Sequence, residues 1–265
     1  MKNILVPIGG HKNALNTLQY AIDFAEELGA KIYLIHIFSS SKVSGSFVNM
    51  DAILVKESKK LVSDRLANVD QKNVEIISKS LKGHTVIDSI KQLKEAFQID
   101  LIITSTKSNT TDKTVFLGNV TGSLVKDLNT PVLIIPSKAK FKPISKILMT
   151  IKSGTIKSVS TISPLIKIQQ KFNSVINLLQ VITPQLEEKD LIINPDLNKI
   201  ISKLIITENA TVYQGVLEFL HDEDPDLICV IRRKRGFFKK LWEDNRVKRV
   251  NFDSKKPLLV LKGTR

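Results

Sequence analysis

An internal repeat constrains the fold of this chain more than any other feature of its sequence. Three short apolar segments of the first half return in the same order in the second half: KNILVPIGG (2–10) as SKILMTIKS (145–153), QIDLIITST (98–106) as DPDLICVIR (224–232), and NTPVLIIP (129–136) as KKPLLVLK (255–262). Self-similarity over such a distance indicates that one structural unit occurs twice. The sequence therefore predicts two domains of the same fold, at residues 1–137 and 143–265.

The distances between repeated residues show that the two copies differ in length. Ile4 and its counterpart Ile147 are 143 residues apart, whereas Pro131 and its counterpart Pro257 are 126 residues apart. The second copy therefore lacks about 17 residues in its middle. We expect this loss in the helix between the second and third strands, which would shrink to about residues 195–204.

Each copy alternates short β-rich apolar runs with segments of helical periodicity. Alternation of this kind predicts βα units on a parallel sheet, and therefore an α/β fold. The strands of the first copy are predicted at 3–8, 31–38, 73–81, 100–105 and 132–136, and its helices at 14–29, 50–67, 84–97 and after Gly118. The second copy follows the same pattern with its shortened middle.

Composition limits the class of protein further. Hydrophobic residues make up 42% of the chain, which is enough to fill well-packed cores. No apolar run approaches the roughly 20 residues of a membrane span, and MKNILVPIGG lacks the apolar region and cleavage site of a signal peptide. The one cysteine, Cys229, lies in the apolar run DLICVI, which predicts a buried structural thiol. We expect a soluble, cytoplasmic protein with no membrane partner.

The repeated segments resemble the universal stress protein family in its tandem form. The resemblance covers nearly the whole chain and is carried by ILVPIGG, GHTVIDSIKQLKEAFQIDLIITS, LGN followed by TPVLIIP, and their copies. It implies two flavodoxin-like domains, each with a five-stranded parallel sheet and helices on both faces. It also implies that the last strands, VLIIP and LLVLK, pair within the chain as a pseudo-twofold, which would cover both sheet edges.

The resemblance implies a place for a nucleotide as well. Many members of the family bind ATP through Gly-x2-Gly-x9-Gly-Ser/Thr after strand four, with an acidic residue just after strand one. Those places hold Gly9, Ser105, Ser108, Gly118 and Asn119 here, so one of five matches. Glycines let the backbone approach a polyphosphate, whereas a serine in a left-handed conformation costs on the order of 1–2 kcal/mol. The helix start at Gly118 can still attract an anion, but the glycine-free loop 105–116 also fits a polar surface loop.

The second copy replaces the nucleotide motif with basic residues. Lys152 should follow its first strand, and Arg232, Arg233 and Lys234 should follow its fourth. These strand ends are neighbours at the switch point of an open α/β sheet, so the four residues predict a crevice that attracts simple anions. Asp244, a predicted N-cap, would repel a phosphate from the helix start beside it.

The segment 232–249 carries nine basic and two acidic residues with aromatic residues between them. Such a composition resembles a patch for nucleic acid or another polyanion. The simpler interpretation is that Phe237, Phe238 and Trp242 anchor the loop on its own domain while the charges stay solvated.

Three functions remain open from the sequence. The leading hypothesis is a non-enzymatic stress-response adaptor or sensor that binds an unknown protein partner and needs no cofactor. The first alternative is a protein that binds ATP or AMP through an altered loop, with slow ATP hydrolysis. The second alternative is a binder of nucleic acid or another polyanion through 232–249. No nucleophile motif, metal-ligand spacing or carboxylate pair predicts a catalytic or metal site.

Overall fold

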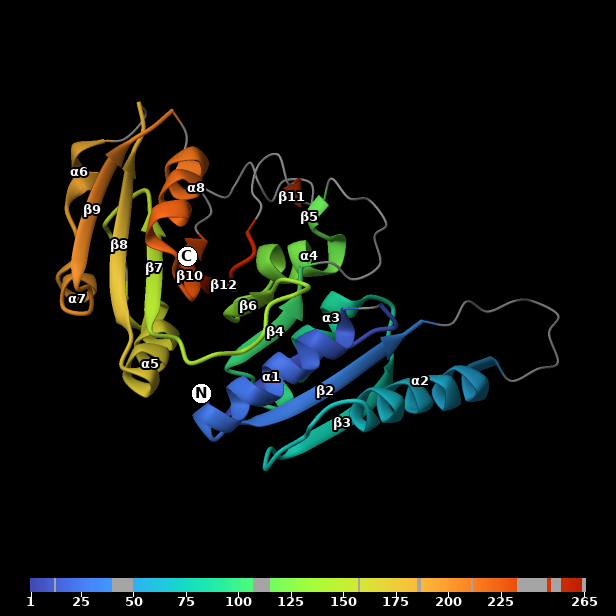
Figure 1. Ribbon diagram of the computed structural model, residues 1–265. Coiled ribbons are helices and arrows are strands. Elements are labelled where there is room, and N and C mark those ends of the chain that lie inside the picture. The colour runs from blue at the N-terminus through green and yellow to red at the C-terminus, as the bar shows by residue number, and fades with distance from the viewer. Residues whose placement is uncertain are drawn as a thin grey trace.

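The computed structural model has a central β-sheet with helices packed on both faces (Figure 1). It describes residues 1–11, 13–39, 50–106, 115–156, 158–184, 187–210, 212–232, 247–248 and 254–263. The first half supplies β1 (Asn3–Pro7), α1 (Ala14–Leu28), β2 (Lys31–Phe38), α2 (Met50–Ala67), β3 (Ile76–Lys82), α3 (Val86–Ala96), β4 (Leu101–Ser105), β5 (Val115–Leu117), α4 (Asn119–Asp127) and β6 (Val132–Ile135). The second half supplies β7 (Lys146–Ile151), the 3-10 helix η1 (Val159–Thr161), α5 (Ser163–Phe172), β8 (Val175–Ile182), α6 (Glu188–Leu191), α7 (Pro195–Asn198), β9 (Lys203–Glu208), α8 (Val212–Glu223), β10 (Leu227–Arg232), β11 (Val247–Lys248) and β12 (Leu258–Lys262).

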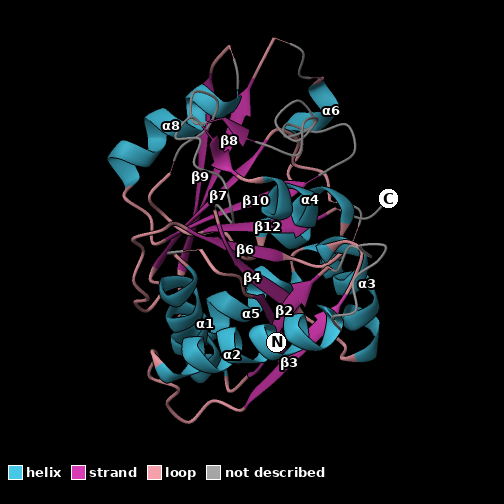
Figure 2. Ribbon diagram, turned by 90° about the vertical axis from the view of Figure 1, so that its right-hand side faces the viewer, coloured by secondary structure: helices cyan, strands magenta, loops and turns pink. Residues whose placement is uncertain are grey.

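Ten of the described strands form one continuous sheet in the order β3-β2-β1-β4-β6-β12-β10-β7-β8-β9. Within each half the five strands are parallel and follow the same order, so the predicted α/β architecture with two similar halves is confirmed. The halves join where β12 runs antiparallel to β6, with Leu259 opposite Leu133. The predicted pairing of VLIIP with LLVLK is therefore present. Figure 2 shows the twist that turns the strands progressively between β9 and β3.

Apolar side chains alternate between the two faces of the sheet and form two cores. One core includes Ile4 and its counterpart Ile147, and the other includes Leu5 and its counterpart Leu148. Helices α1, α2 and α5 pack on the first core, whereas α3, α4 and α8 pack on the second. Because each core contains residues of both halves, the boundary between the halves is a continuous apolar interior.

A repeated carboxylate holds the first strand of each half in place. Asp100 Oδ2 accepts the backbone N–H groups of Lys2 and Asn3, at 2.6 and 3.1 Å. Its counterpart Asp226 Oδ2 accepts those of Ser145 and Lys146, at 2.9 and 3.0 Å. The two aspartates of the sequence repeat are therefore structural: each ties the start of one strand to the segment that enters its neighbour.

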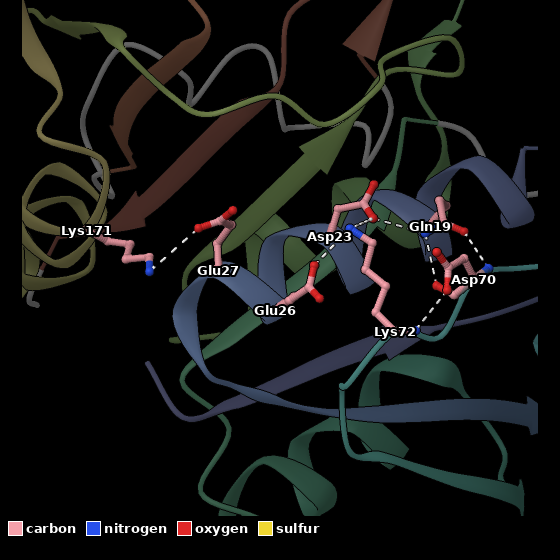
Figure 3. A network of polar contacts seen from close by, with 7 residues as sticks. All are labelled: Gln19, Asp23, Glu26, Glu27, Asp70, Lys72 and Lys171. Carbon is pink, nitrogen blue, oxygen red and sulfur yellow. Dashed lines mark hydrogen bonds and ion pairs between the residues drawn. The ribbon is translucent and has the colours of Figure 1, made fainter.

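Polar contacts add to the apolar boundary between the halves (Figure 3). Lys171 Nζ of α5 lies 3.6 Å from Glu27 Oε2 of α1, which links the two halves. Asp23 and Glu26 of the same helix α1 pair within the first half with Lys72, which lies between α2 and β3: Lys72 Nζ is 2.9 Å from both Asp23 Oδ1 and Glu26 Oε2. Exposed ion pairs of this kind contribute about 0–1 kcal/mol each, so the apolar cores carry most of the stability.

The middle of the second half departs from the sequence prediction. A helix was expected over 195–204, but α7 ends at Asn198 and β9 begins at Lys203. The run LIIT within β9 is rich in β-branched residues, which favour a strand, and Ser202 N–H already donates to the carbonyl of Ile176. The predicted helix was therefore too long.

Candidate functional site

The candidate residues of the first half lie around the end of β4. Ser105 is the last residue of this strand and is buried, with its backbone extended in the ladder beside β6. Thr106 follows it, and its carbonyl accepts the N–H of Gly118 at 2.9 Å. The carbonyl of Ser105 accepts the hydroxyl of Thr121 at 2.8 Å. The loop after β4 is thus closed at its base by hydrogen bonds within the protein.

Gly118 does not use the conformational freedom that a glycine offers. Its backbone has φ −76° and ψ 169°, an extended conformation that any residue adopts. It caps α4 without a side-chain hydrogen bond, and the first turn of α4 holds no acidic residue. The helix start that includes the exposed Asn119 therefore keeps its positive end. Ser108, the remaining candidate of this loop, lies outside the described residues.

Gly9 lies two residues beyond the end of β1, in the position where the family resemblance implies an acidic side chain. A Cβ atom built on Gly9 would meet Cδ2 of His11 at 3.7 Å, which is an ordinary contact. A Cβ atom therefore fits at this position without a clash. Burial, followed by the charge of Arg65, holds the pKa of His11 below its ordinary value, so this ring stays neutral at neutral pH.

The counterpart region of the second half is filled by its own chain. Lys152 follows β7, and Gly154 comes two residues later, with its N–H donating to the carbonyl of Asp190 at 2.8 Å. A Cβ atom on Gly154 would lie 2.4 Å from the carbonyl oxygen of Ile192. The segment between α6 and α7 therefore packs directly on the loop after β7.

Arg232 ends β10 on the same edge of the sheet as Lys152, because Thr150 of β7 lies opposite Val230 of β10. Its Nη1 donates to the carbonyl oxygen of Lys126, in the last turn of α4. A cation at this place compensates the negative end of the helix. Arg232 thereby connects the halves. Arg233, Lys234 and Asp244 lie outside the described residues.

The loops after β4 and β10 meet in a small second sheet. β5 pairs antiparallel with β11, with Leu117 opposite Val247. Phe116 and Leu117 are buried in the second core, so the predicted surface loop 105–116 gives way to a buried strand at its C-terminal end. Sequence analysis missed this pairing and the role of Thr121. The one available signal for Thr121 was its position three residues after Gly118.

The other titratable groups of the described residues that stand out have structural surroundings. Cys229 is fully buried, and burial raises the pKa of its thiol, as expected for a structural cysteine. His36 Nδ1 lies 2.6 Å from the hydroxyl of Ser58. In the described part of the chain, no three His, Cys, Asp or Glu side chains are placed to hold a metal ion. Likewise, no described helix is long and apolar enough to cross a membrane.

Two parallel five-stranded sheets with helices on both faces, joined through their last strands, define a tandem flavodoxin-like α/β protein. Residues 1–136 match the model of the universal stress protein family. The chain therefore belongs to the universal stress protein family.

Individual relatives agree with this assignment. A universal stress protein of Methanocaldococcus jannaschii is 25% identical over 144 residues, which cover 52% of this chain and 84% of the relative. The crystal structure of a universal stress protein from Archaeoglobus fulgidus superposes with a TM-score of 0.72 at 16% identity and covers 98% of both chains. A functionally unknown protein from Pseudomonas aeruginosa superposes with a TM-score of 0.62 at 15% identity, over 99% of this chain and 93% of that one. These two structures show that the fold extends over both halves.

Proposed function

We propose that this universal stress protein is a non-enzymatic adaptor or sensor with a degenerate nucleotide site. The observation that carries the proposal is the base of the loop after β4, which is closed by hydrogen bonds within the protein. The N–H of Gly118 is bonded to Thr106, Thr121 ties α4 to Ser105, and β5 is paired with β11. A phosphate-binding loop needs backbone N–H groups that face the ligand and glycines that admit it.

The second half supports the same proposal. The segment around Ile192 packs against Gly154 beside the first-strand end, and Arg232 donates to the C-terminal end of α4. A polyphosphate would have to displace these contacts. In this proposal the domains at 1–137 and 143–265 act as one body, without a required cofactor. The fully buried Cys229 fits work in a reducing compartment such as the cytosol.

Calorimetry with ATP tests the proposal. The native protein should show no micromolar binding, whereas a variant that carries Gly9→Asp, Ser105→Gly and Ser108→Gly should bind ATP about tenfold more tightly, because these three substitutions restore three positions of the motif and about 1.4 kcal/mol corresponds to tenfold in affinity. Gly10→Asp replaces Gly9→Asp in the matched control. A Cβ on Gly10 would also find room, at 3.9 Å from Leu61 Cδ1, but the position is not in the motif. Micromolar affinity of the native protein for ATP would refute the proposal.

A further inference from the structure

A pocket with a volume of about 420 Å³ lies at the boundary between the two halves. Its first-half wall comes from the segments that enter β4 and β6, including Asp100 and Thr130. Its second-half wall comes from η1, the first turns of α5 and the end of β12, including Thr161, Lys167 and Lys262. On the first half it lies at the opposite end of the strands from the loop after β4. None of the described candidate residues of the nucleotide or anion sites lines it.

Two residues that line this pocket carry a buried hydroxyl group without a hydrogen-bond partner among the described residues. Thr130 is 2% exposed and Thr161 is 5% exposed, and Oγ1 of each lacks a partner among the described residues. One threonine belongs to each half. Because a buried polar group that is left unpaired is costly, two such groups in the walls of one pocket favour an occupant that accepts hydrogen bonds from them.

The charges around the pocket favour an anion. Three lysines line it, Lys94, Lys167 and Lys262, against one acidic residue, Asp100. The Asp100 carboxylate already accepts two backbone N–H groups at the start of β1. Lys167 is exposed and forms no ion pair with a carboxylate of the described residues. The first turn of α5 holds no acidic residue, so the positive end of its helix dipole adds to the same field.

We propose that this pocket binds a small organic phosphate. The phosphoryl oxygens would accept hydrogen bonds from the hydroxyls of Thr130 and Thr161 and form an ion pair with the ammonium group of Lys167. The organic part would lie against Ile99 and Pro164. The pocket volume falls within the range of about 300–1,000 Å³ that small-molecule sites occupy. A ligand held by both halves stabilises their union by mass action. This site does not depend on the state of the loop after β4, and it would supply a signal for a sensor.

Calorimetry and thermal unfolding with ribose 5-phosphate test the proposal, with inorganic phosphate and ribose as separate arms. Ribose 5-phosphate should bind and raise the unfolding temperature, inorganic phosphate should do so more weakly, and neutral ribose should do neither. The affinity should fall at high salt, because exposed charges such as Lys167 are screened. The proposal is overturned if neither phosphate compound binds, or if ribose binds equally well.

Variants separate this site from a merely structural role. Thr130→Val and Thr161→Val keep the side-chain shape and remove the unpaired hydroxyl, so the protein without ligand should be as stable as before or more stable. Binding of ribose 5-phosphate should nevertheless weaken about tenfold or more in each variant, since a hydrogen bond to a charged group is lost. Equal affinity in both variants and the native protein would overturn the proposal.

A charge variant and its control complete the test. Lys167→Ala should weaken binding, whereas Lys171→Ala, one turn further along α5 and paired with Glu27 instead, should not. If both variants lost the same amount of binding affinity, the effect would come from the net charge of the protein and not from Lys167, and the proposed site would be overturned. An ATP signal that persists in Lys167→Ala, while ribose 5-phosphate binding is lost, would refute the degenerate nucleotide site and support the pocket.

Discussion

Gly154 shows at the scale of one residue how the loop after the first strand differs between the two halves. Its amide hydrogen bonds to Asp190, and the carbonyl of Ile192 occupies the space beside its Cα. Gly9, which lies close to the corresponding position of the first half, has room for a Cβ atom, which would meet only Cδ2 of His11 at 3.7 Å. The same loop is therefore packed in one half and accessible in the other.

Gly154→Ala should therefore destabilise the protein. A Cβ at 2.4 Å from a backbone oxygen forces the segment between α6 and α7 to move, and overpacking of this kind costs about 1–3 kcal/mol. Gly9→Ala is the matched control and should change the free energy of unfolding by less than about 0.5 kcal/mol. Urea unfolding of both variants gives the comparison. Similar values for the two would show that the loop after β7 is not packed as described.

Asp226 is a second residue whose role is structural. Burial by itself would raise the pKa of its carboxyl, but hydrogen bonds from Lys142 and from the backbone of Lys146 and Ser145 hold the pKa below its ordinary value. A carboxyl with a lowered pKa stabilises the folded state above the pKa of the unfolded chain. This contribution is lost as the pH falls through the folded pKa.

Asp226→Asn should lower the free energy of unfolding at pH 7 by about 1–3 kcal/mol, because the hydrogen bonds lose their charged acceptor. The gap to the native protein should begin to narrow below about pH 4, where the carboxyl of the unfolded chain becomes protonated, and should close as the pH falls through the lower pKa of the folded protein. Asp224→Asn is the control, since its side chain is 79% exposed and pairs with Lys256 at the surface. A gap that stays constant between pH 7 and pH 3 would contradict this role.

At the scale of the elements, the halves differ most where the second one has lost its long middle helix. In the first half α2 packs on β3, and the strand carries Ser78 and Ser80 on the side of a groove that α2 lines. In the second half the corresponding positions of β9 hold Leu204 and Ile206, which are 41% and 55% exposed. The lost helix leaves an apolar strip on the edge strand.

Replacement of this strip by the residues of the first half tests its exposure. A variant with Leu204→Ser and Ile206→Ser should lose no more than about 1 kcal/mol of stability, because exposed side chains contribute little packing. Leu178→Ser on the neighbouring β8 is the control, since this side chain is fully buried and its loss should cost several times more. If the double variant lost as much stability as Leu178→Ser, the side chains of Leu204 and Ile206 would have to be covered in solution.

The elements also show which features the sequence could predict. Buried strands such as β4 and β10 read as apolar runs, and their repetition predicted the α/β halves and the pairing of the last strands. The helix expected at 195–204 failed because a shortened crossover leaves no periodic segment to read. The pairing of β5 with β11 could not be predicted, because it forms between loops that are brought together only when the halves dock. The family motif gave the sequence positions of the candidate site residues. The hydrogen bond from the Thr121 hydroxyl to the carbonyl of Ser105 could not be predicted, because it forms only when α4 packs beside the end of β4.

The whole molecule is built around the shared edge between β6 and β12. The strand β6 is fully buried in the intact chain, and both cores continue across this edge. A fragment of residues 1–137 would expose β6 as an unpaired apolar edge, which is a template for pairing with another chain. The behaviour of this fragment therefore tests how far the first half depends on the second.

The fragment 1–137 should therefore form a dimer through β6, in place of the missing β12. Light scattering after gel filtration should give twice the fragment mass, with dissociation on dilution. The intact chain is the control, because β12 already occupies this edge. A stable, monomeric fragment would contradict the importance of this edge.

The central claim is that the nucleotide site of this universal stress protein is degenerate. Mass spectrometry of the small molecules released from freshly purified protein tests it most directly, because it needs no added ligand. Because hydrogen bonds of Gly118 and Thr121 close the base of the loop after β4, we expect that neither ATP nor AMP is recovered in stoichiometric amount. Recovery of one ATP or AMP per chain would contradict it.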